Sequence, residues 1–281
     1  MNFSVIGDPI EHSLSPLIHG AVIEKLGLPH SYDAHRVAPE GLAAFVDRAR
    51  TEALGGFNVT MPHKVTIMSL LDKISDSSKT YRSVNTVVNR GGVLTGYSTD
   101  SEGFARSLAY EGISFIGKNV LILGAGGVVG PLAILLAGGA TSVTILNIFP
   151  EMAQEICGIA ERTIGKSNLF WGHFNEAAAC AGNADLLINA TPLGMKGFAH
   201  GYENFEFLDR LPKTAAVCDV IYSPPKTRLL QESEKRGHKI MNGLGMLIFQ
   251  ALVGDKMYFD VDFDMDEMYE FVAEKVKTRI G

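Results

Sequence analysis

Two charged residues in the first hundred positions, Lys64 and Asp100, form a candidate ion pair that could transfer protons. Lys64 closes the segment Gly55-Gly-Phe-Asn-Val-Thr-Met-Pro-His-Lys64, in which an expected strand ends at polar residues. Asp100 follows a second expected strand over 93–97. Polar side chains at the carboxyl ends of strands in α/β proteins usually face the ligand crevice. A lysine and a carboxylate brought together there could serve general acid–base chemistry.

Both residues also have a structural interpretation. Asp100 fits the N-cap of a helix. Lys64 is expected in the first turn of a helix that starts at Pro62, where a positive charge opposes the helix dipole. A purely structural role therefore explains Asp100 better than Lys64.

Two hydroxyls come early in the chain. Ser13 and Ser15 precede an apolar helical stripe, and Pro16 suits the first helical position if Ser15 is the N-cap. Ser15 is then a cap alone, or both serines hold a carboxylate at the helix N-terminus.

A glycine turn organises the middle of the chain. The apolar run Val120 to Leu123 predicts a buried parallel strand, and Gly124-Ala-Gly-Gly127 then turns the chain into a helix that starts at about Val128. Free backbone N–H groups at such a helix N-terminus suit a pyrophosphate. The match to G-x-G-x-x-G is imperfect because Val129 holds the third glycine position, so a purely structural turn is the alternative.

Composition excludes several classes of protein. The 281 residues carry a net charge of −6, which argues against a general nucleic-acid or acidic-membrane surface. No run reaches the roughly 18 apolar residues of a membrane span, and the start has no basic n-region or apolar h-region. The three cysteines, Cys157, Cys180 and Cys218, are widely spaced in apolar surroundings and are expected to be buried free thiols. We expect a cytoplasmic protein with no membrane or nucleic-acid partner.

Strand and helix signals alternate along the whole chain and predict an α/β protein. Tandem βα units before and after residue 104 indicate two domains, and those after it predict a right-handed, mostly parallel sheet with helices on both faces.

Eight motifs, in this order, resemble those of the shikimate dehydrogenase family, which includes shikimate and quinate dehydrogenases. They are Ser13-Leu-Ser-Pro16, Asn58-Val-Thr-x-Pro-x-Lys64, Val84-Asn-Thr86, Thr99-Asp100, Gly124-Ala-Gly-Gly127, Asn189-Ala-Thr-Pro-Leu-Gly-Met195, Asp219-Val-Ile-Tyr-Ser-Pro-x-x-Thr227 and Gly243-Leu-Gly-Met-Leu-x-x-Gln250. Each motif is weak alone, but the ordered set covers nearly the whole chain and is highly specific.

The resemblance implies an architecture and a reaction. It implies an α/β substrate-binding catalytic domain over 1–104 plus 243–281 and a Rossmann-type dinucleotide-binding domain over 105–242, separated by a cleft. It implies an oxidoreductase that reversibly reduces 3-dehydroshikimate to shikimate with NADP or NAD, in aromatic amino acid and chorismate biosynthesis. The expected partner is this small-molecule substrate, and the protein is expected to be a monomer or a homodimer.

The resemblance also assigns roles to residues. Lys64 and Asp100 resemble the family's catalytic pair: Lys64 would donate a proton towards the ketone oxygen and Asp100 would orient the ammonium group and a substrate hydroxyl. The substrate carboxylate would bind Ser13, Ser15 and Tyr222, and the ring hydroxyls would bind Asn58, Thr60, Asn85, Asp100 and Gln250. The cofactor would bind Gly124, Ala125, Gly126, Gly127, Val128, Asn147, Thr191, Pro192, Val220 and Gly243. No metal is expected, because His12, His19 and His63 have no ligand spacing.

The chain departs from the family most at the cofactor. NADP-dependent members usually carry an arginine after the second dinucleotide strand, but Ile148 holds that position here, and no Lys or Arg occurs between Thr141 and Arg162. The ribose-binding carboxylate typical of NAD sites is also missing from the strand end. The absent cation shifts the expectation from the family default, NADP, towards NAD.

Smaller departures leave the substrate open. Gly20 stands where the family often has Asn after its His, and Ser98 replaces the common Asn before Thr-Asp. Quinate or aminoshikimate are therefore alternative substrates, although the serine pair is more typical of shikimate enzymes. A non-catalytic ligand-binding protein on the same scaffold is a further alternative, and retention of Lys64 and Asp100 speaks against it.

Overall fold

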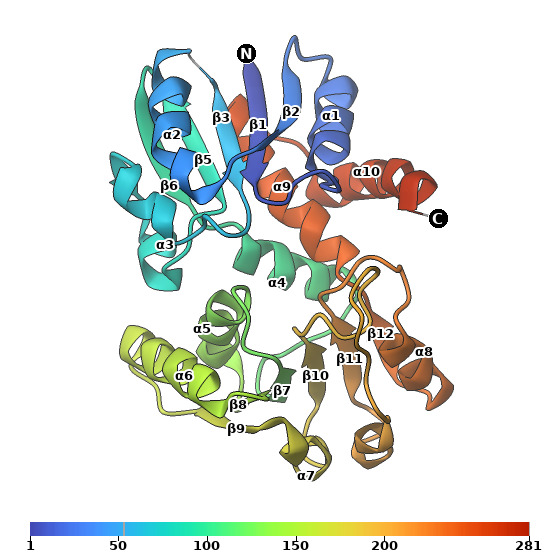
Figure 1. The fold of residues 1–281 in the computed structure, drawn as a ribbon. Helices are drawn as coiled ribbons and strands as arrows, with labels where there is room; N and C mark the ends of the chain where they lie inside the picture. The colour runs from blue at the N-terminus through green and yellow to red at the C-terminus, as the bar shows by residue number, and fades with distance from the viewer. Residues whose placement is uncertain (53, 281) are drawn as a thin grey trace. The chain divides into compact units, whose positions relative to one another are not determined.

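The computed structural model describes residues 1–52 and 54–280, and the chain divides into two compact units. The first comprises Met1–Gly103 and Leu247–Arg279, and the second is built from Phe104–Met246. The first unit contains the blue to cyan elements of Figure 1 together with the orange and red helices at the C-terminal end of the chain.

The first unit contains a mixed six-stranded sheet in the order β2-β1-β3-β5-β6-β4. β1 pairs in parallel with β2 and β3, whereas β5 is antiparallel to β3 and β6. The strands are β1 (Asn2–Gly7), β2 (Ser31–Arg36), β3 (Gly56–Val59), β4 (Lys73–Ile74), β5 (Thr86–Arg90) and β6 (Val93–Tyr97). The helices are α1 (Ser15–Leu26), η1 (Pro39–Gly41), α2 (Leu42–Thr51), η2 (Thr66–Leu70), α3 (Asp76–Tyr81), α9 (Leu244–Phe259) and α10 (Met265–Ile280). A further helix, α4 (Asp100–Tyr110), begins in the first unit and continues into the second.

Alternation along β1 divides the core of this unit between the two faces of its sheet. Phe3 and Val5 pack in a cluster with Ile23 of α1 and Tyr258 of α9. Ile6 points to the opposite face and belongs to a cluster with residues of α2 and η2. The sheet is thus covered on both faces by helices, which leaves the ends of its strands to carry polar groups.

The second unit contains a six-stranded, wholly parallel sheet in the order β12-β11-β10-β7-β8-β9. This doubly wound order reverses between β7 and β10, and ligands bind such sheets beyond the carboxyl ends of the strands at that reversal. The strands are β7 (Asn119–Leu123), β8 (Ser142–Asn147), β9 (Leu169–His173), β10 (Leu186–Asn189), β11 (Ala216–Asp219) and β12 (Lys239–Met241). The helices are α5 (Val129–Gly139), α6 (Pro150–Ile164), η3 (Phe174–Glu176), α7 (Ala177–Ala181), η4 (Glu206–Arg210) and α8 (Arg228–Lys235).

The predicted α/β class and the parallel sheet are confirmed. Val120 to Leu123 are all buried, as expected of a central parallel strand covered on both faces. The sequence did not predict the short β4 and β12, whose two and three residues carry little pattern. Cys157 and Cys218 are buried free thiols as expected, whereas Cys180 is only partly buried. No helix in the described part of the chain combines the length and the apolar character that a membrane crossing requires.

Candidate active site

Lys64 and Asp100 form an ion pair in the first unit. The Lys64 Nζ donates to the Asp100 Oδ2 at 2.6 Å, and the side chains are 28% and 8% exposed. Lys64 follows β3, and Asp100 is the first residue of α4 after β6. The two loops thus place a proton-bearing ammonium group, still partly open to solvent, beside a buried carboxylate.

The helix expected from Pro62 does not form. Residues 61–65 make a turn, and η2 begins only at Thr66. Val65, Thr66 and Ile67 are β-branched in succession, which disfavours a longer α-helix. The argument from the helix dipole was therefore wrong for Lys64, whose position is explained by its ion pair and by the backbone bond from Val84 N to Lys64 O at 2.8 Å.

Asn85 is the centre of a buried network around the pair. Its Nδ2 lies 3.1 Å from Asp100 Oδ1, 3.0 Å from Gln250 Oε1 and 2.8 Å from Thr99 Oγ1. Its Oδ1 accepts from Thr99 N at 2.7 Å. This amide therefore orients the Asp100 carboxylate and brings Gln250 of the C-terminal helix α9 into the same cluster.

A second amide, Asn58, continues this network from β3. Its Nδ2 donates to Asn85 O and to Thr86 Oγ1, each at 3.1 Å, while its Oδ1 accepts from Tyr32 Oη at 2.6 Å. The sequence did not assign roles to Tyr32, Thr86 or Thr99. The two threonines lie within the motifs quoted above, but no sequence pattern pointed to Tyr32, which lies on β2, two strands away from β3 in the sheet.

Ser13 and Ser15 lie together at the start of α1, with Ser15 N donating to Ser13 Oγ at 3.3 Å. The N-cap assignment of Ser15 was wrong. Ser15 is the first helical residue, Leu14 is the N-cap without a side-chain bond, and Ser13 supplies the hydroxyl that accepts from the helix. The turn closed by Ser13 N and Ile10 O at 3.0 Å brings Ser13 into that position.

Thr60 follows β3 directly and is half-buried. Its backbone N donates to Ile6 O at 2.9 Å, so the main chain fixes its place at the carboxyl end of the parallel pair β1–β3. Lys64 lies four residues further along the same turn.

In the second unit, the glycine turn joins β7 to α5 at the reversal of the strand order. Gly124 has φ +108°, and a Cβ there would lie 2.7 Å from Ala190 O, so only glycine fits. At Gly127 a Cβ would meet no atom within 4 Å, and both Gly126 and Gly127 are exposed. A tight turn that is open beside the N-terminus of an 11-residue helix fits a pyrophosphate group.

The loops that follow β10 and β11 reach the same edge of this sheet. Thr191 N and Thr191 Oγ1 both bond Asn189 Oδ1, at 3.0 and 2.6 Å. A Cβ at Gly243 would lie 2.0 Å from Val220 O, so the loop after β12 can pass Val220 only as glycine. Tyr222 follows in the loop after β11, and burial raises the pKa of its hydroxyl. Pro192 lies in the loop after β10, whereas Ala125 and Val128 lie in the turn between β7 and α5.

A cavity of about 500 Å³ borders the end of β8. Ile148 is 59% exposed and lines it together with His173, Tyr202, Glu203 and Glu206. Asn147 lies beside it and donates from Nδ2 to Phe149 O at 3.1 Å. The charged lining consists of carboxylates, with no Lys or Arg among the lining residues.

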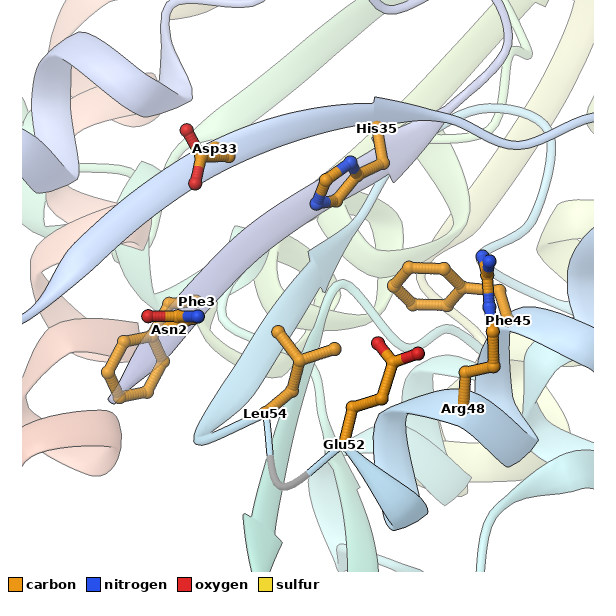
Figure 2. Close-up of a pocket in the computed structure, with 8 residues that line it drawn as sticks. All are labelled: Asn2, Phe3, Asp33, His35, Phe45, Arg48, Glu52 and Leu54. Carbon is orange, nitrogen blue, oxygen red and sulfur yellow. The ribbon is translucent and has the colours of Figure 1, made fainter.

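Figure 2 shows a separate cavity of about 360 Å³ in the first unit. Asp33 and His35 of β2 line it opposite Arg48 and Glu52, which come from α2 and its C-terminal end. None of the expected site residues lies in its lining. Across the described ranges 1–52 and 54–280, no group of three His, Cys, Asp or Glu side chains is arranged to hold a metal ion.

These features define a class of protein. A doubly wound parallel unit with a tight glycine turn, in one chain with a second α/β unit that carries a Lys–Asp pair, is the arrangement of a two-domain α/β dehydrogenase.

Comparisons with known proteins identify the family. The family model described as shikimate dehydrogenase substrate binding domain matches residues 5–87. The shikimate dehydrogenase (NADP(+)) of Alkaliphilus metalliredigens (strain QYMF) is 42% identical over 274 residues, which cover 96% of both chains. The solved shikimate 5-dehydrogenase from Listeria monocytogenes, in complex with shikimate and NAD, is 33% identical with a TM-score of 0.84 and 96% coverage of both chains. The quinate dehydrogenase from Corynebacterium glutamicum, in complex with NAD, is 27% identical with a TM-score of 0.89, covering 98% of this chain and 99% of that one.

The chain belongs to the shikimate dehydrogenase family and is an oxidoreductase. The resemblance inferred from its eight motifs is thereby confirmed.

Proposed function

We propose that the protein catalyses the reversible, nicotinamide-dependent reduction of 3-dehydroshikimate to shikimate, in the biosynthesis of aromatic amino acids through chorismate. Residues 1–104 and 243–281 would form the substrate-binding catalytic domain, and 105–242 the dinucleotide-binding domain. The observation that carries this proposal is the Lys64–Asp100 pair, joined at 2.6 Å inside a cluster of amides and hydroxyls. The free, largely unexposed thiols fit a reducing cytoplasm.

Lys64 is the proton donor of the proposed mechanism. A bound nicotinamide supplies the hydride for reduction and accepts it in the reverse direction. Negative charge develops on the ketone oxygen during reduction, and the Lys64 ammonium group stabilises that charge and transfers a proton to the oxygen. Asp100 holds the ammonium group in place and accepts from a neighbouring substrate hydroxyl.

The remaining polar residues fit a small polyhydroxy acid, whose hydroxyls each need a partner once they are buried. Ser13, Ser15 and Tyr222 are proposed to bind its carboxylate, and Asn58, Thr60, Asn85 and Gln250 its ring hydroxyls. The buried network around Asn85 supports this assignment, because it holds Asp100 and Gln250 in fixed orientations before any ligand binds.

The glycine turn and the strand-end loops of the second unit are proposed to hold the cofactor. The open backbone at Gly126 and Gly127 would face the pyrophosphate, and Asn147 would lie near the ribose of the adenosine half. The remaining proposed contacts are Gly124, Ala125, Val128, Thr191, Pro192, Val220 and Gly243.

Lys64→Ala tests the mechanism. We expect kcat for shikimate oxidation to fall by about 10²- to 10⁴-fold, the usual contribution of a positioned acid–base group. Lys73→Ala is the matched control, because Lys73 is an exposed lysine of β4 in the same unit. A folded Lys64→Ala variant that keeps near-normal turnover would refute the mechanism.

We further propose that the enzyme prefers NAD to NADP. The names of its relatives include both nucleotides, so the preference depends on this chain's own residues. Ile148 is exposed where a cation would grip the 2′-phosphate, and Glu203 and Glu206 line the adjoining cavity. Two carboxylates near a dianionic phosphate would oppose its binding.

Ile148→Arg tests this preference. The new guanidinium group can pair with the 2′-phosphate, so we expect the ratio of kcat/KM for NADP to that for NAD to rise at least about tenfold. Ile116→Arg adds the same charge at another exposed isoleucine, which lies before the amino end of β7, and serves as the control. A wild-type enzyme that strongly prefers NADP would overturn the proposal.

Quinate oxidation is the second candidate activity, favoured by the similarity to a quinate dehydrogenase. One matrix of kcat/KM values, with shikimate, quinate and aminoshikimate each tested with NAD and NADP, separates the candidates. Ligand binding without turnover in every cell of that matrix would instead favour a non-catalytic protein.

A further inference from the structure

Asp219 is a buried carboxylate that the proposed mechanism does not use. It is the last residue of β11 and is 1% exposed. Its Oδ1 accepts from Asn189 Nδ2 and from Ile221 N, each at 3.0 Å, and its Oδ2 accepts from Thr227 Oγ1 at 2.6 Å. One carboxylate thus ties the end of β10, the loop after β11 and the N-cap of α8 together.

The bond to Asn189 determines which way that amide faces. Because its Nδ2 points to Asp219, its Oδ1 is free to accept from Thr191 N, Thr191 Oγ1 and Tyr202 Oη, at 3.0, 2.6 and 2.9 Å. Asp219 and the Thr191 N–H, which can only donate, together fix this orientation, because a flip would present the amide NH₂ group to these donors. The backbone of the Thr191 loop therefore depends on a carboxylate that lies behind it.

The other two hydrogen bonds to Asp219 fix the loop after β11. Ile221 N is the backbone donor between Val220 and Tyr222, and it bonds directly to Asp219. Thr227 caps α8 by accepting from Leu230 N at 3.4 Å, and its hydroxyl proton goes to Asp219. Both ends of the segment 220–227 are therefore fixed to one side chain.

We propose that Asp219 is a positioning residue for cofactor binding: its carboxylate holds the loops 190–194 and 220–226 in the conformation that receives the nicotinamide nucleotide. The cofactor role rests on the proposed function, whereas the ordering of the two loops by Asp219 does not.

The charge state of Asp219 gives the proposal a pH signature. Burial raises the pKa of its carboxyl to about 6, although its three hydrogen bonds favour the ionised form. Burial also raises the pKa of the neighbouring Cys218 thiol and Tyr202 hydroxyl, which therefore stay uncharged. Two cations at the start of α8 are exposed and engaged elsewhere: Lys226, which precedes the helix, pairs with Glu234, and Arg228 lies over the Phe205 ring.

The sign of the effect follows from the donors. Above pH 6 the ionised carboxylate accepts all three hydrogen bonds. Below pH 6 the carboxyl becomes neutral and accepts from the same donors more weakly, because hydrogen bonds to an ionised group are about twice as strong, so the loops loosen. Cofactor affinity should therefore fall as the pH drops from 7 to 5.

The test compares wild-type protein with Asp219→Ala, Asp219→Asn and Thr227→Val. The dissociation constants of NAD, NADH and NADP are measured by calorimetry between pH 5 and 8. We expect Asp219→Ala to weaken binding of the preferred nucleotide at pH 7.5 about tenfold or more, as the loss of buried hydrogen bonds predicts. Asp219→Asn should weaken nucleotide binding less than Asp219→Ala does, and it should abolish the change in affinity near pH 6. Thr227→Val should weaken nucleotide binding but retain the change in affinity near pH 6.

Hydrogen exchange of the cofactor-free protein separates this inference from the proposed function. Peptides covering 190–194 and 220–226 should exchange faster in Asp219→Asn and Thr227→Val than in wild type, whatever the protein binds. Asp185→Asn is the matched control, since Asp185 accepts from a backbone amide, Asn119 N at 2.9 Å, at the opposite end of β10. Unchanged loop exchange in both test variants, or a pH transition that persists in Asp219→Asn, would overturn the inference. A wild type that binds no nucleotide while its loops behave as expected would refute the proposed function alone.

Discussion

At the scale of single residues, hydrogen bonds within the protein orient the Lys64–Asp100 pair and the two amides beside it. Lys64 and Asp100 are 36 positions apart in the chain, yet they meet at 2.6 Å because the turns after β3 and β6 converge. Asn85 and Asn58 supply most of their N–H groups to the protein itself. Because this network is oriented in advance, the polar groups need not reorganise when the substrate binds, and each can stabilise the transition state more strongly.

Thr60→Val tests the substrate side at this scale. Valine keeps the shape of threonine but removes its hydroxyl, and the backbone bond from Thr60 N to Ile6 O remains. We expect KM for shikimate to rise about tenfold, the typical effect of one lost hydrogen bond, with the dissociation constant of NAD unchanged. Thr66→Val, at an exposed position in the same segment, controls for the loss of a hydroxyl. Unaltered substrate kinetics would remove Thr60 from the site.

At the scale of elements, a buried pair connects the beginning of the chain to its end. His19 of α1 and Asp255 of α9 lie 2.6 Å apart, and both side chains are 0% exposed. Burial raises the pKa of Asp255, and the neighbouring His19 opposes that rise. An exposed pair, Lys25 of α1 with Glu267 of α10 at 3.7 Å, adds a second link, so α1 contacts both C-terminal helices.

Comparing His19→Ala with Lys25→Ala shows how much each of the two pairs contributes to the free energy of unfolding. His19→Ala leaves the Asp255 carboxyl without its ring partner and removes a ring stacked on Tyr32, so we expect the free energy of unfolding to fall by about 3 kcal/mol or more. Lys25→Ala should cost less than about 1 kcal/mol, because that pair is exposed to solvent. Both values come from urea denaturation followed by circular dichroism. Equal losses would mean that the buried pair does not anchor α9 to α1.

At the scale of the whole molecule, the chain forms two units with separate cores. One has a mixed sheet that includes an antiparallel half, and the other has a parallel sheet in doubly wound order. The C-terminal helices return to the first unit, so the second is inserted into the first along the chain (Figure 1). We expect this arrangement to give substrate and cofactor separate binding surfaces.

Hydrogen exchange with each ligand alone tests that division. Shikimate should slow exchange in peptides around residues 58–64 and 85–100, and NAD in those around 123–130, 189–194 and 219–222. Each ligand stabilises the segments that it contacts, by an amount set by its concentration relative to its dissociation constant. Peptides of β9, at the edge of the second sheet, should not respond to shikimate. Protection by shikimate confined to the second unit would contradict the proposed domain roles.

Much of the fold was readable from local patterns. The apolar run Val120 to Leu123 with its glycines predicted a central parallel strand and a helix from about Val128, and α5 begins at Val129. Such predictions succeed because the sequence pattern of a buried strand or a glycine turn is contained within a few consecutive residues. The prediction failed where the outcome depended on neighbours: Lys64 lies in a turn rather than a helix, and β12 forms only because β11 offers it a partner.

The sequence alone determined the family, the reaction class and the residue types at the site, because motif order and spacing are properties of the chain. The tertiary structure decided which of those residues meet. It brought Gln250 to Asn85 across 165 positions, placed Tyr32 on Asn58, and gathered three donors on Asp219. These contacts join side chains distant in sequence, and their partners follow from strand pairing and burial, which no short stretch of sequence encodes.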